Sequence, residues 1–121
     1  MSGIVGVLLA AGAARRFGAH KLLHPLADGT PVGVAAATSL IAALPHSLAV
    51  VRPDDHPLID ALTSLGFGIV ENPAAAQGMG TSLAAGVGAA ADADGWLIAL
   101  ADMPWIGTGT HRRLAQGLRD G

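Results

Sequence analysis

The chain has 121 residues, which suits a single domain with a core of its own. Its formal net charge of −2, with 13% charged residues and no basic run after Lys21, argues against a nucleic-acid partner or a membrane-binding face. The sequence contains no cysteine, which excludes disulfides and cysteine-ligated zinc.

The first element of the chain is an apolar run, Ile4–Leu9, which predicts a strand buried on both faces. The run is too short to cross a bilayer, and a secretory signal would carry basic residues before its apolar part. Here Arg15 and Arg16 follow the run, and no Lys or Arg precedes it. We therefore expect a cytoplasmic protein.

The segment after this strand has the composition of a phosphate-binding loop. Small residues let a polyphosphate approach the backbone, and Gly12 and Gly18 can adopt backbone angles that other residues resist. Arg16 and Lys21 would supply positive charge. The segment matches neither the G-x-G-x-x-G dinucleotide fingerprint nor the Walker loop. The alternative is an arginine-rich solvated turn after a buried strand.

The remaining elements are predicted from the spacing of apolar residues and from glycine and proline positions. An extended piece at 21–26 and a turn at 27–30 lead to Pro31, where a helix would begin with Thr30 as a candidate N-cap. Further strands are expected at 47–51, 68–71 and 96–101, and helices at 32–44, 56–65, 81–91 and 111–118.

This alternation of strands and helices predicts an α/β fold with a mostly parallel sheet and helices on both faces. Ligands of such sheets bind at the carboxyl ends of the strands. Three segments that carry chemistry follow strands: residues 10–21, residues 71–82 and Asp102. The sequence therefore predicts one site where these three segments meet.

Asp102 comes directly after the last predicted strand and shortly before Pro104. A carboxylate in this place can hold Mg²⁺ against phosphate oxygens, and such an ion would neutralise charge on a transferring phosphoryl group. The alternative is that Asp102 only caps the turn before Pro104.

The segment Glu71–Leu83 leaves a strand and enters a helix through two glycines. Gly78 and Gly80 would let the backbone lie flat against a planar base, whose edge could meet the Ser82 hydroxyl. The alternative is an ordinary helix start in which Thr81 or Ser82 is the N-cap.

The motifs, in chain order, are Leu9-Ala10-Ala11-Gly12…Arg16-Phe17-Gly18…Lys21, Asn72-Pro73…Gly78-Met79…Ser82-Leu83 and Leu100-Ala101-Asp102-Met103-Pro104. Taken together, this set resembles the molybdenum cofactor nucleotidyltransferase family. Its Gly-Met-x-x-Ser-Leu pattern is most similar to the molybdopterin cytidylyltransferase branch, and the guanylyltransferases form the neighbouring branch.

The resemblance implies a Rossmann-like three-layer sandwich, the nucleotide-diphospho-sugar transferase fold, with residues 1–121 as the N-terminal, nucleotide-binding portion of a single domain. It implies Mg²⁺-dependent transfer of CMP or GMP from CTP or GTP to a phosphate monoester such as molybdopterin, with release of pyrophosphate. The implied catalytic residues are Arg16, Lys21 and Asp102, with Asp102 as the metal ligand. The implied nucleotide-binding residues are Leu9, Ala10, Ala11, Gly12, Arg16, Lys21, Asn72, Gly78 and Ser82.

The chain departs from the family pattern in two ways. Position 14 is Ala where the family often has Ser, and the sequence ends at Gly121, before the stretch with which family members complete the sheet and the acceptor pocket. We therefore expect an open sheet edge, which could promote a homodimer. Two alternatives stay open: a catalytically incomplete nucleotide- or cofactor-binding module, and a relative that uses another acceptor.

Overall fold

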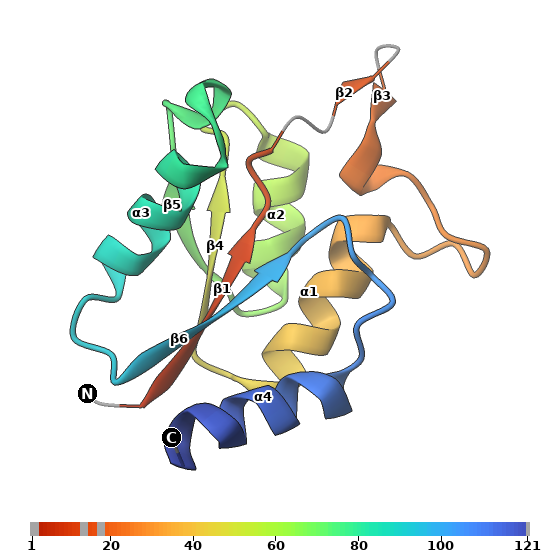
Figure 1. The fold of residues 1–121 in the computed structure, drawn as a ribbon. Coiled ribbons are helices and arrows are strands. Elements are labelled where there is room, and N and C mark those ends of the chain that lie inside the picture. Colours follow the sequence, from red (N-terminus) through yellow and green to blue (C-terminus); the bar gives the residue numbers. More distant parts are fainter. Residues whose placement is uncertain (1–2, 13–14, 17–18, 121) are drawn as a thin grey trace.

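A parallel four-stranded sheet forms the centre of the molecule (Figure 1). The computed structural model describes residues 3–12, 15–16 and 19–120. The strands lie in the order β5-β4-β1-β6, so the first strand of the chain is a central one. Their bounds are β1 (Ile4–Leu9), β4 (Ser47–Val51), β5 (Gly68–Glu71) and β6 (Gly95–Leu100). All three pairings are parallel, which places the carboxyl ends of the four strands at one edge.

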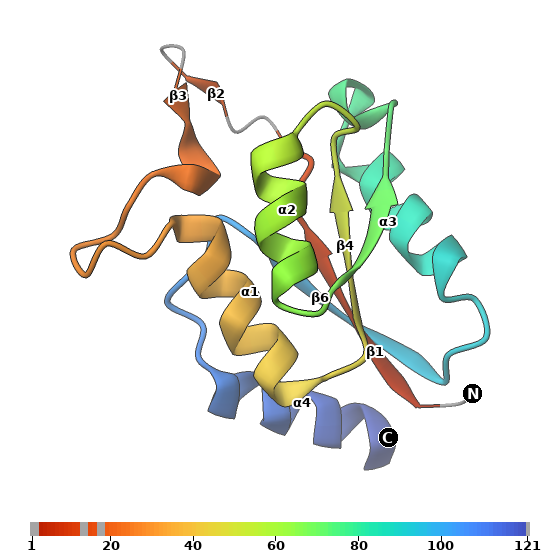
Figure 2. The same ribbon diagram turned by 180° about the vertical axis from the view of Figure 1, so that it is seen from behind.

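Helices cover both faces of this sheet, as the alternation of elements predicts (Figures 1 and 2). One face carries α1 (Val32–Ala43), α2 (His56–Ser64) and α4 (Thr108–Asp120), and the other carries α3 (Met79–Ala89). The result is the expected three-layer α/β sandwich. No helix in the described part of the chain combines the length and the apolar character that a membrane crossing requires.

The core follows from the alternation of side chains along the strands. On β1, Leu8 packs with the buried residues of α1, α2 and α4, whereas Val7 and Leu9 form a second cluster beneath α3. Both Val7 and Leu8 are fully buried. A central strand of a parallel sheet is covered on both faces, which explains its unbroken apolar sequence.

Most predicted elements are confirmed, and the differences lie in the connections. The segment predicted as extended at 21–26 begins instead with a 3-10 helix, η1 (Lys21–Leu23). Thr30 is not the N-cap of α1: Pro31 precedes the helix, and no side chain caps it. The backbone N–H of Thr30 is instead bonded to the Asp28 carboxylate at 3.0 Å. This bond holds the pKa of Asp28 below its usual value.

A small antiparallel hairpin follows the first strand, and the sequence did not predict it. It consists of β2 (Arg15–Arg16) and β3 (Ala19–His20) and projects beyond the carboxyl edge of the sheet (Figure 1). A short 3-10 turn, η2 (Ala75–Gln77), precedes α3, which begins at Met79 rather than at residue 81. The last helix, α4, extends past the predicted 111–118 at both ends.

One histidine lies in the core rather than on the surface. His111 of α4 is buried, and its Nδ1 atom has no hydrogen-bond partner among the described residues. Burial disfavours the charged imidazolium and lowers the pKa of His111. His111 thus packs as a buried side chain of α4.

Gly86 of α3 lies against the sheet so closely that a side chain has no room. A Cβ atom there would lie 2.6 Å from Val7 Cγ1 and 3.0 Å from Val50 Cγ2. We expect Gly86→Ala to lower the free energy of unfolding by about 1–3 kcal/mol, because overpacking exceeds the gain in helix propensity. Urea denaturation measures this change.

Gly88, two residues on in the same helix, is the matched control. It is exposed, and a Cβ atom there would meet nothing within 4 Å. Gly88→Ala should therefore raise the free energy of unfolding by about 0.5–1 kcal/mol. Equal effects of the two substitutions would contradict the close packing of α3 on β1 and β4.

Candidate functional site

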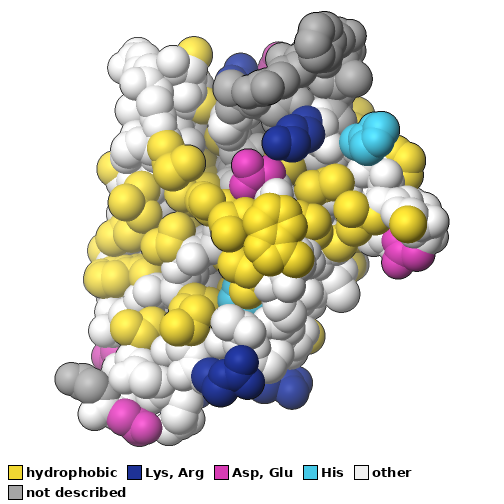
Figure 3. All heavy atoms as spheres, turned by 45° about the vertical axis from the view of Figure 1, so that its right-hand side comes forward, with side chains coloured by type: hydrophobic (Ala, Val, Ile, Leu, Met, Phe, Trp, Pro, Cys, Tyr) yellow, Lys and Arg dark blue, Asp and Glu magenta, His cyan; other side chains and the backbone are white. Residues whose placement is uncertain are grey.

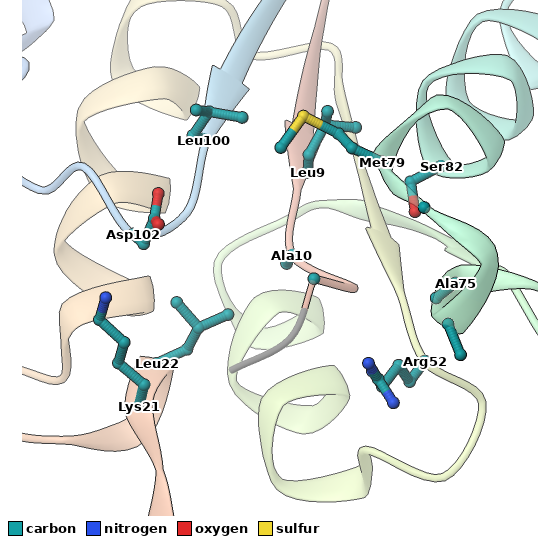
Figure 4. Close-up of a pocket in the computed structure, with 13 residues that line it drawn as sticks. Leu9, Ala10, Lys21, Leu22, Arg52, Ala75, Met79, Ser82, Leu100 and Asp102 are labelled. Atoms are coloured by element: carbon teal, nitrogen blue, oxygen red, sulfur yellow. The ribbon is translucent and has the colours of Figure 1, made fainter. Parts of the chain in front are cut away.

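A cavity of about 530 Å³ opens at the carboxyl edge of the sheet. This volume lies in the range of small-molecule sites, and the position is where parallel sheets bind ligands. Figure 4 shows the cavity between the end of β1, the start of α3 and the segment after β6. Its lining residues are Leu9, Ala10, Gly12, Lys21, Leu22, Arg52, Ala75, Ala76, Gly78, Met79, Ser82, Leu100 and Asp102.

The three segments that the sequence predicted to meet do line this one cavity. Gly12 and Lys21 come from the segment after β1, Gly78 and Ser82 from the segment after β5, and Asp102 from the end of β6. Parallel pairing brings them together, because each segment leaves the sheet at the same edge.

Backbone hydrogen bonds hold these strand exits side by side. The N–H of Ala10 donates to the carbonyl of Val50 at 2.8 Å, and the N–H of Ala101 donates to the carbonyl of Leu9 at 3.1 Å. Both bonds extend the sheet pairing by one residue beyond β1 and β6. The floor of the cavity is therefore a rigid continuation of the sheet.

Lys21 and Asp102 lie on one side of the cavity and point toward the same space (Figure 4). Both side chains are exposed. No hydrogen bond to the Asp102 carboxylate is found among the described residues, so the structure gives no support to its role as a turn cap. A cation and a carboxylate at one cavity wall suit a phosphate group with its metal ion.

The start of α3 forms the opposite wall. Gly78 has a φ of 130°, a backbone conformation that side chains resist, and it is the residue that precedes the helix. Thr81 and Ser82 therefore lie inside α3, and the alternative in which either is the N-cap is wrong. Ser82 lines the cavity from the first turns of the helix.

Asn72 does not line the cavity but supports its wall from behind. Only 5% of Asn72 is exposed, and its Nδ2 group donates to Ser82 Oγ at 2.9 Å and to Thr81 Oγ1 at 3.0 Å. Its Oδ1 atom accepts a hydrogen bond from the N–H of Ala74 at 3.0 Å. Asn72 thus ties the loop after β5 to the start of α3.

Two other residues predicted for the site have different positions. Ala11 is fully buried and does not line the cavity, and its carbonyl oxygen accepts a hydrogen bond from Arg52 Nε. Arg16 belongs to β2, and its side chain lies outside the part of the structure that is described.

Arg52 is a cavity residue that the sequence analysis missed. It follows β4 directly, whereas Asp102 follows β6 after one intervening residue, and the Nε atom of Arg52 donates to the Ala11 carbonyl at 3.0 Å. The signal that could have identified Arg52 is the place of a charged residue immediately after a predicted strand. The described charged residues of the lining are two cations, Lys21 and Arg52, and one anion, Asp102. This excess of positive charge favours an anionic ligand.

The fold and the cavity define a Rossmann-like α/β domain with a ligand site at the carboxyl edge of its sheet. The sequence matches the MobA-like NTP transferase domain over residues 6–121. The chain therefore belongs to the family of MobA-like NTP transferase domains.

Individual relatives agree with this family. The chain is 37% identical over 120 residues to the nicotine blue oxidoreductase of Paenarthrobacter nicotinovorans, covering 98% of this chain and 58% of that protein. It superposes on a nucleotidyl transferase from Methanothermobacter thermautotroptrophicus with a TM-score of 0.82 and 29% identity, covering 94% of this chain and 57% of the other.

A third relative is Rv0371c from Mycobacterium tuberculosis, with a TM-score of 0.71 and 25% identity over 98% of this chain and 61% of that one. The same protein has a structure in complex with manganese. The chain spans less than two thirds of the length of each of these relatives.

We expect Asn72→Ala to loosen the start of α3. The substitution removes both donors to Thr81 and Ser82 and leaves buried partners unsatisfied, so the free energy of unfolding should fall by about 1–3 kcal/mol. Chemical denaturation measures the loss. Gln77→Ala, which removes an exposed amide from the same loop, should change stability by less than about 0.5 kcal/mol. Equal stability of Asn72→Ala and the wild type would contradict the bracing role.

Proposed function

We propose that the chain is the nucleotide-binding part of a nucleotidyltransferase that moves CMP or GMP from a nucleoside triphosphate to a phosphate monoester such as molybdopterin. The observation that carries this proposal is that Lys21 and Asp102 face one cavity at the carboxyl edge of the sheet, in a member of the MobA-like NTP transferase family. The Gly78-Met79-x-x-Ser82-Leu83 motif favours CTP.

In the proposed reaction, a phosphate oxygen of the acceptor attacks the α-phosphorus of the nucleotide in line. A new P–O bond forms to the acceptor, the bond from the α-phosphorus to the bridging oxygen breaks, and pyrophosphate leaves with that electron pair. No nucleophile from the protein is needed, so positioning and electrostatics carry the rate. The N–H groups around Gly12 bind phosphate oxygens, and Lys21 and Arg16 stabilise the charge of the leaving pyrophosphate.

Asp102 is the proposed ligand of Mg²⁺. Mg²⁺ commonly uses one or two carboxylates together with substrate phosphates, so a single carboxylate at the cavity wall fits this ion. When bound, the ion neutralises charge on the phosphates.

The base would lie against the start of α3. Gly78 exposes its backbone there, and Ser82, held by Asn72, presents a hydroxyl.

A reaction that consumes CTP or GTP also supports the proposed location in the cytoplasm, which cell fractionation with an antibody to the chain would test.

A second candidate is a nucleotide- or cofactor-binding module without turnover, or a relative with another acceptor. The observation that favours it is that one relative is named an oxidoreductase. Release of pyrophosphate from CTP or GTP in the presence of a pterin phosphate separates transfer from binding alone.

Calorimetric titration of the chain with CTP and GTP, with and without Mg²⁺, tests the proposed site. We expect Mg²⁺ to tighten binding, and Asp102→Ala to weaken binding in Mg²⁺ by about tenfold or more, because the carboxylate that holds the ion is lost. Asp94→Ala, at the other end of β6, is the matched control and should bind as the wild type does. If the folded wild-type chain binds neither nucleotide, the proposal is wrong.

We also propose that β6 pairs with a second copy of the chain. Among the described residues, β6 has a strand partner only at β1, and no charged residue or proline interrupts Gly95–Leu100. Ile98 is 40% exposed and Trp105 is 72% exposed. Figure 3 shows hydrophobic side chains gathered on one face of the molecule.

Light scattering after size exclusion should give twice the mass of the 12.0 kDa chain. Ile98→Lys should shift the protein to a monomer, because an edge lysine opposes strand pairing. Thr63→Lys on the exposed side of α2 adds the same charge elsewhere and should leave the dimer intact. A wild-type chain that elutes as a clean monomer rules the dimer out.

A further inference from the structure

We infer that Arg52 reads the base of the bound nucleotide and selects bases with two adjacent hydrogen-bond acceptors. Guanine offers O6 and N7, and cytosine offers O2 and N3, whereas adenine and uracil place a donor beside the acceptor. The inference rests on the proposed function, since it assigns a role within the same nucleotide site. It adds a residue that none of the three sequence motifs contains.

Arg52 is fixed in place before any ligand binds. Its Nε–H donates to the Ala11 carbonyl at 3.0 Å, so one edge of the guanidinium is bound to the segment after β1. Its backbone carbonyl accepts a hydrogen bond from the N–H of Asp55 at 3.2 Å, at the start of α2. The following Pro53 restricts the backbone of Arg52 further. A planar side chain held in this way keeps a defined direction.

The remaining donors of Arg52 are directed at the cavity. Arginine carries five N–H donors, and one of them is used by Ala11. No other hydrogen bond or ion pair of this guanidinium is found within the described residues. Arg52 lines the cavity, and Figure 4 shows its Nη atoms toward the cavity space. The two Nη groups therefore form a free fork of parallel donors.

The position of this fork favours the base over the phosphates. Lys21 and Asp102 lie together on one side of the cavity, where phosphates and a metal ion would bind (Figure 4). Arg52 lies across from them, on the same side of the cavity as Ala75 of η2 (Figure 4). The cavity lining includes the small residues Ala75, Ala76 and Gly78, which leave room for a planar ring. A nucleotide with its phosphates at Lys21 thus extends its base toward Arg52.

The chemistry of the fork decides which bases it accepts. Arginine has donors and no acceptor, and it pairs with adjacent acceptors such as guanine O6 and N7. Glutamine has one donor and one acceptor at its end and pairs instead with adenine N6 and N7. An exchange of Arg52 for Gln therefore replaces the paired donors by one donor and one acceptor, on a side chain that is shorter by two bonds.

The experiment measures binding of GTP, CTP, ATP, UTP and inorganic tripolyphosphate to the chain in Mg²⁺ by calorimetry. The wild type should bind GTP or CTP about tenfold more tightly than ATP and UTP. Arg52→Gln should lower the preference for GTP or CTP over ATP by about tenfold. It should weaken tripolyphosphate binding less than GTP or CTP binding, because tripolyphosphate loses only the charge of Arg52 and no base contact. Arg112→Gln, which removes an exposed arginine of α4, is the matched control and should keep the wild-type preference.

Arg52→Lys keeps the charge and loses the fork, so it should also lose the preference for GTP or CTP. If Arg52→Gln does not fold, the wild-type profile and Arg52→Lys still decide the question. Equal binding of all four nucleotides by the wild type overturns the inference. So does an equal loss for all nucleotides and tripolyphosphate in Arg52→Gln, which would make Arg52 a phosphate contact. If the wild type binds tripolyphosphate and all four nucleotides equally, the proposed nucleotide site stands and only the role of Arg52 is wrong. If the wild type binds no nucleotide, both the proposed function and the role of Arg52 are wrong.

Discussion

The parallel pairing of β1 with both β4 and β6 is the constraint on which the site depends. Parallel strands that share a register end together, so the residues after them leave the sheet at one edge. The bonds from Ala10 to Val50 and from Ala101 to Leu9 continue this pairing past the strands. The floor of the cavity is therefore positioned by backbone hydrogen bonds.

Packing of α3 on the sheet provides the second wall. Gly86 allows the helix to approach Val7 and Val50, and Asn72 fixes the start of the helix from the loop after β5. These two features act at different ends of α3, one by absence of a side chain and the other by hydrogen bonds. Together they position the start of α3, and with it Ser82, relative to the strands.

The cavity divides its charged groups between two sides. Lys21 and Asp102 lie together on one side of the cavity, and Arg52 lies on the other side (Figure 4). Such a separation suits an elongated ligand with a polyanionic end and a second end that offers hydrogen-bond acceptors. The proposed nucleotide has this form, and the membership of the MobA-like NTP transferase family gives it a chemical context.

The sequence by itself determined the class of fold, the buried strands and the meeting of three segments at one edge, because apolar periodicity and glycine and proline positions are local signals. It did not determine the hairpin β2–β3, the 3-10 helix η1 or the first residue of α3, because connections are shaped by contacts distant in the chain. Only the tertiary structure decided that Asn72 lies behind the wall and Ala11 beneath it. The tertiary structure also decided the place of Arg52, because its hydrogen bond to Ala11 joins residues 41 positions apart and no local pattern encodes such a contact.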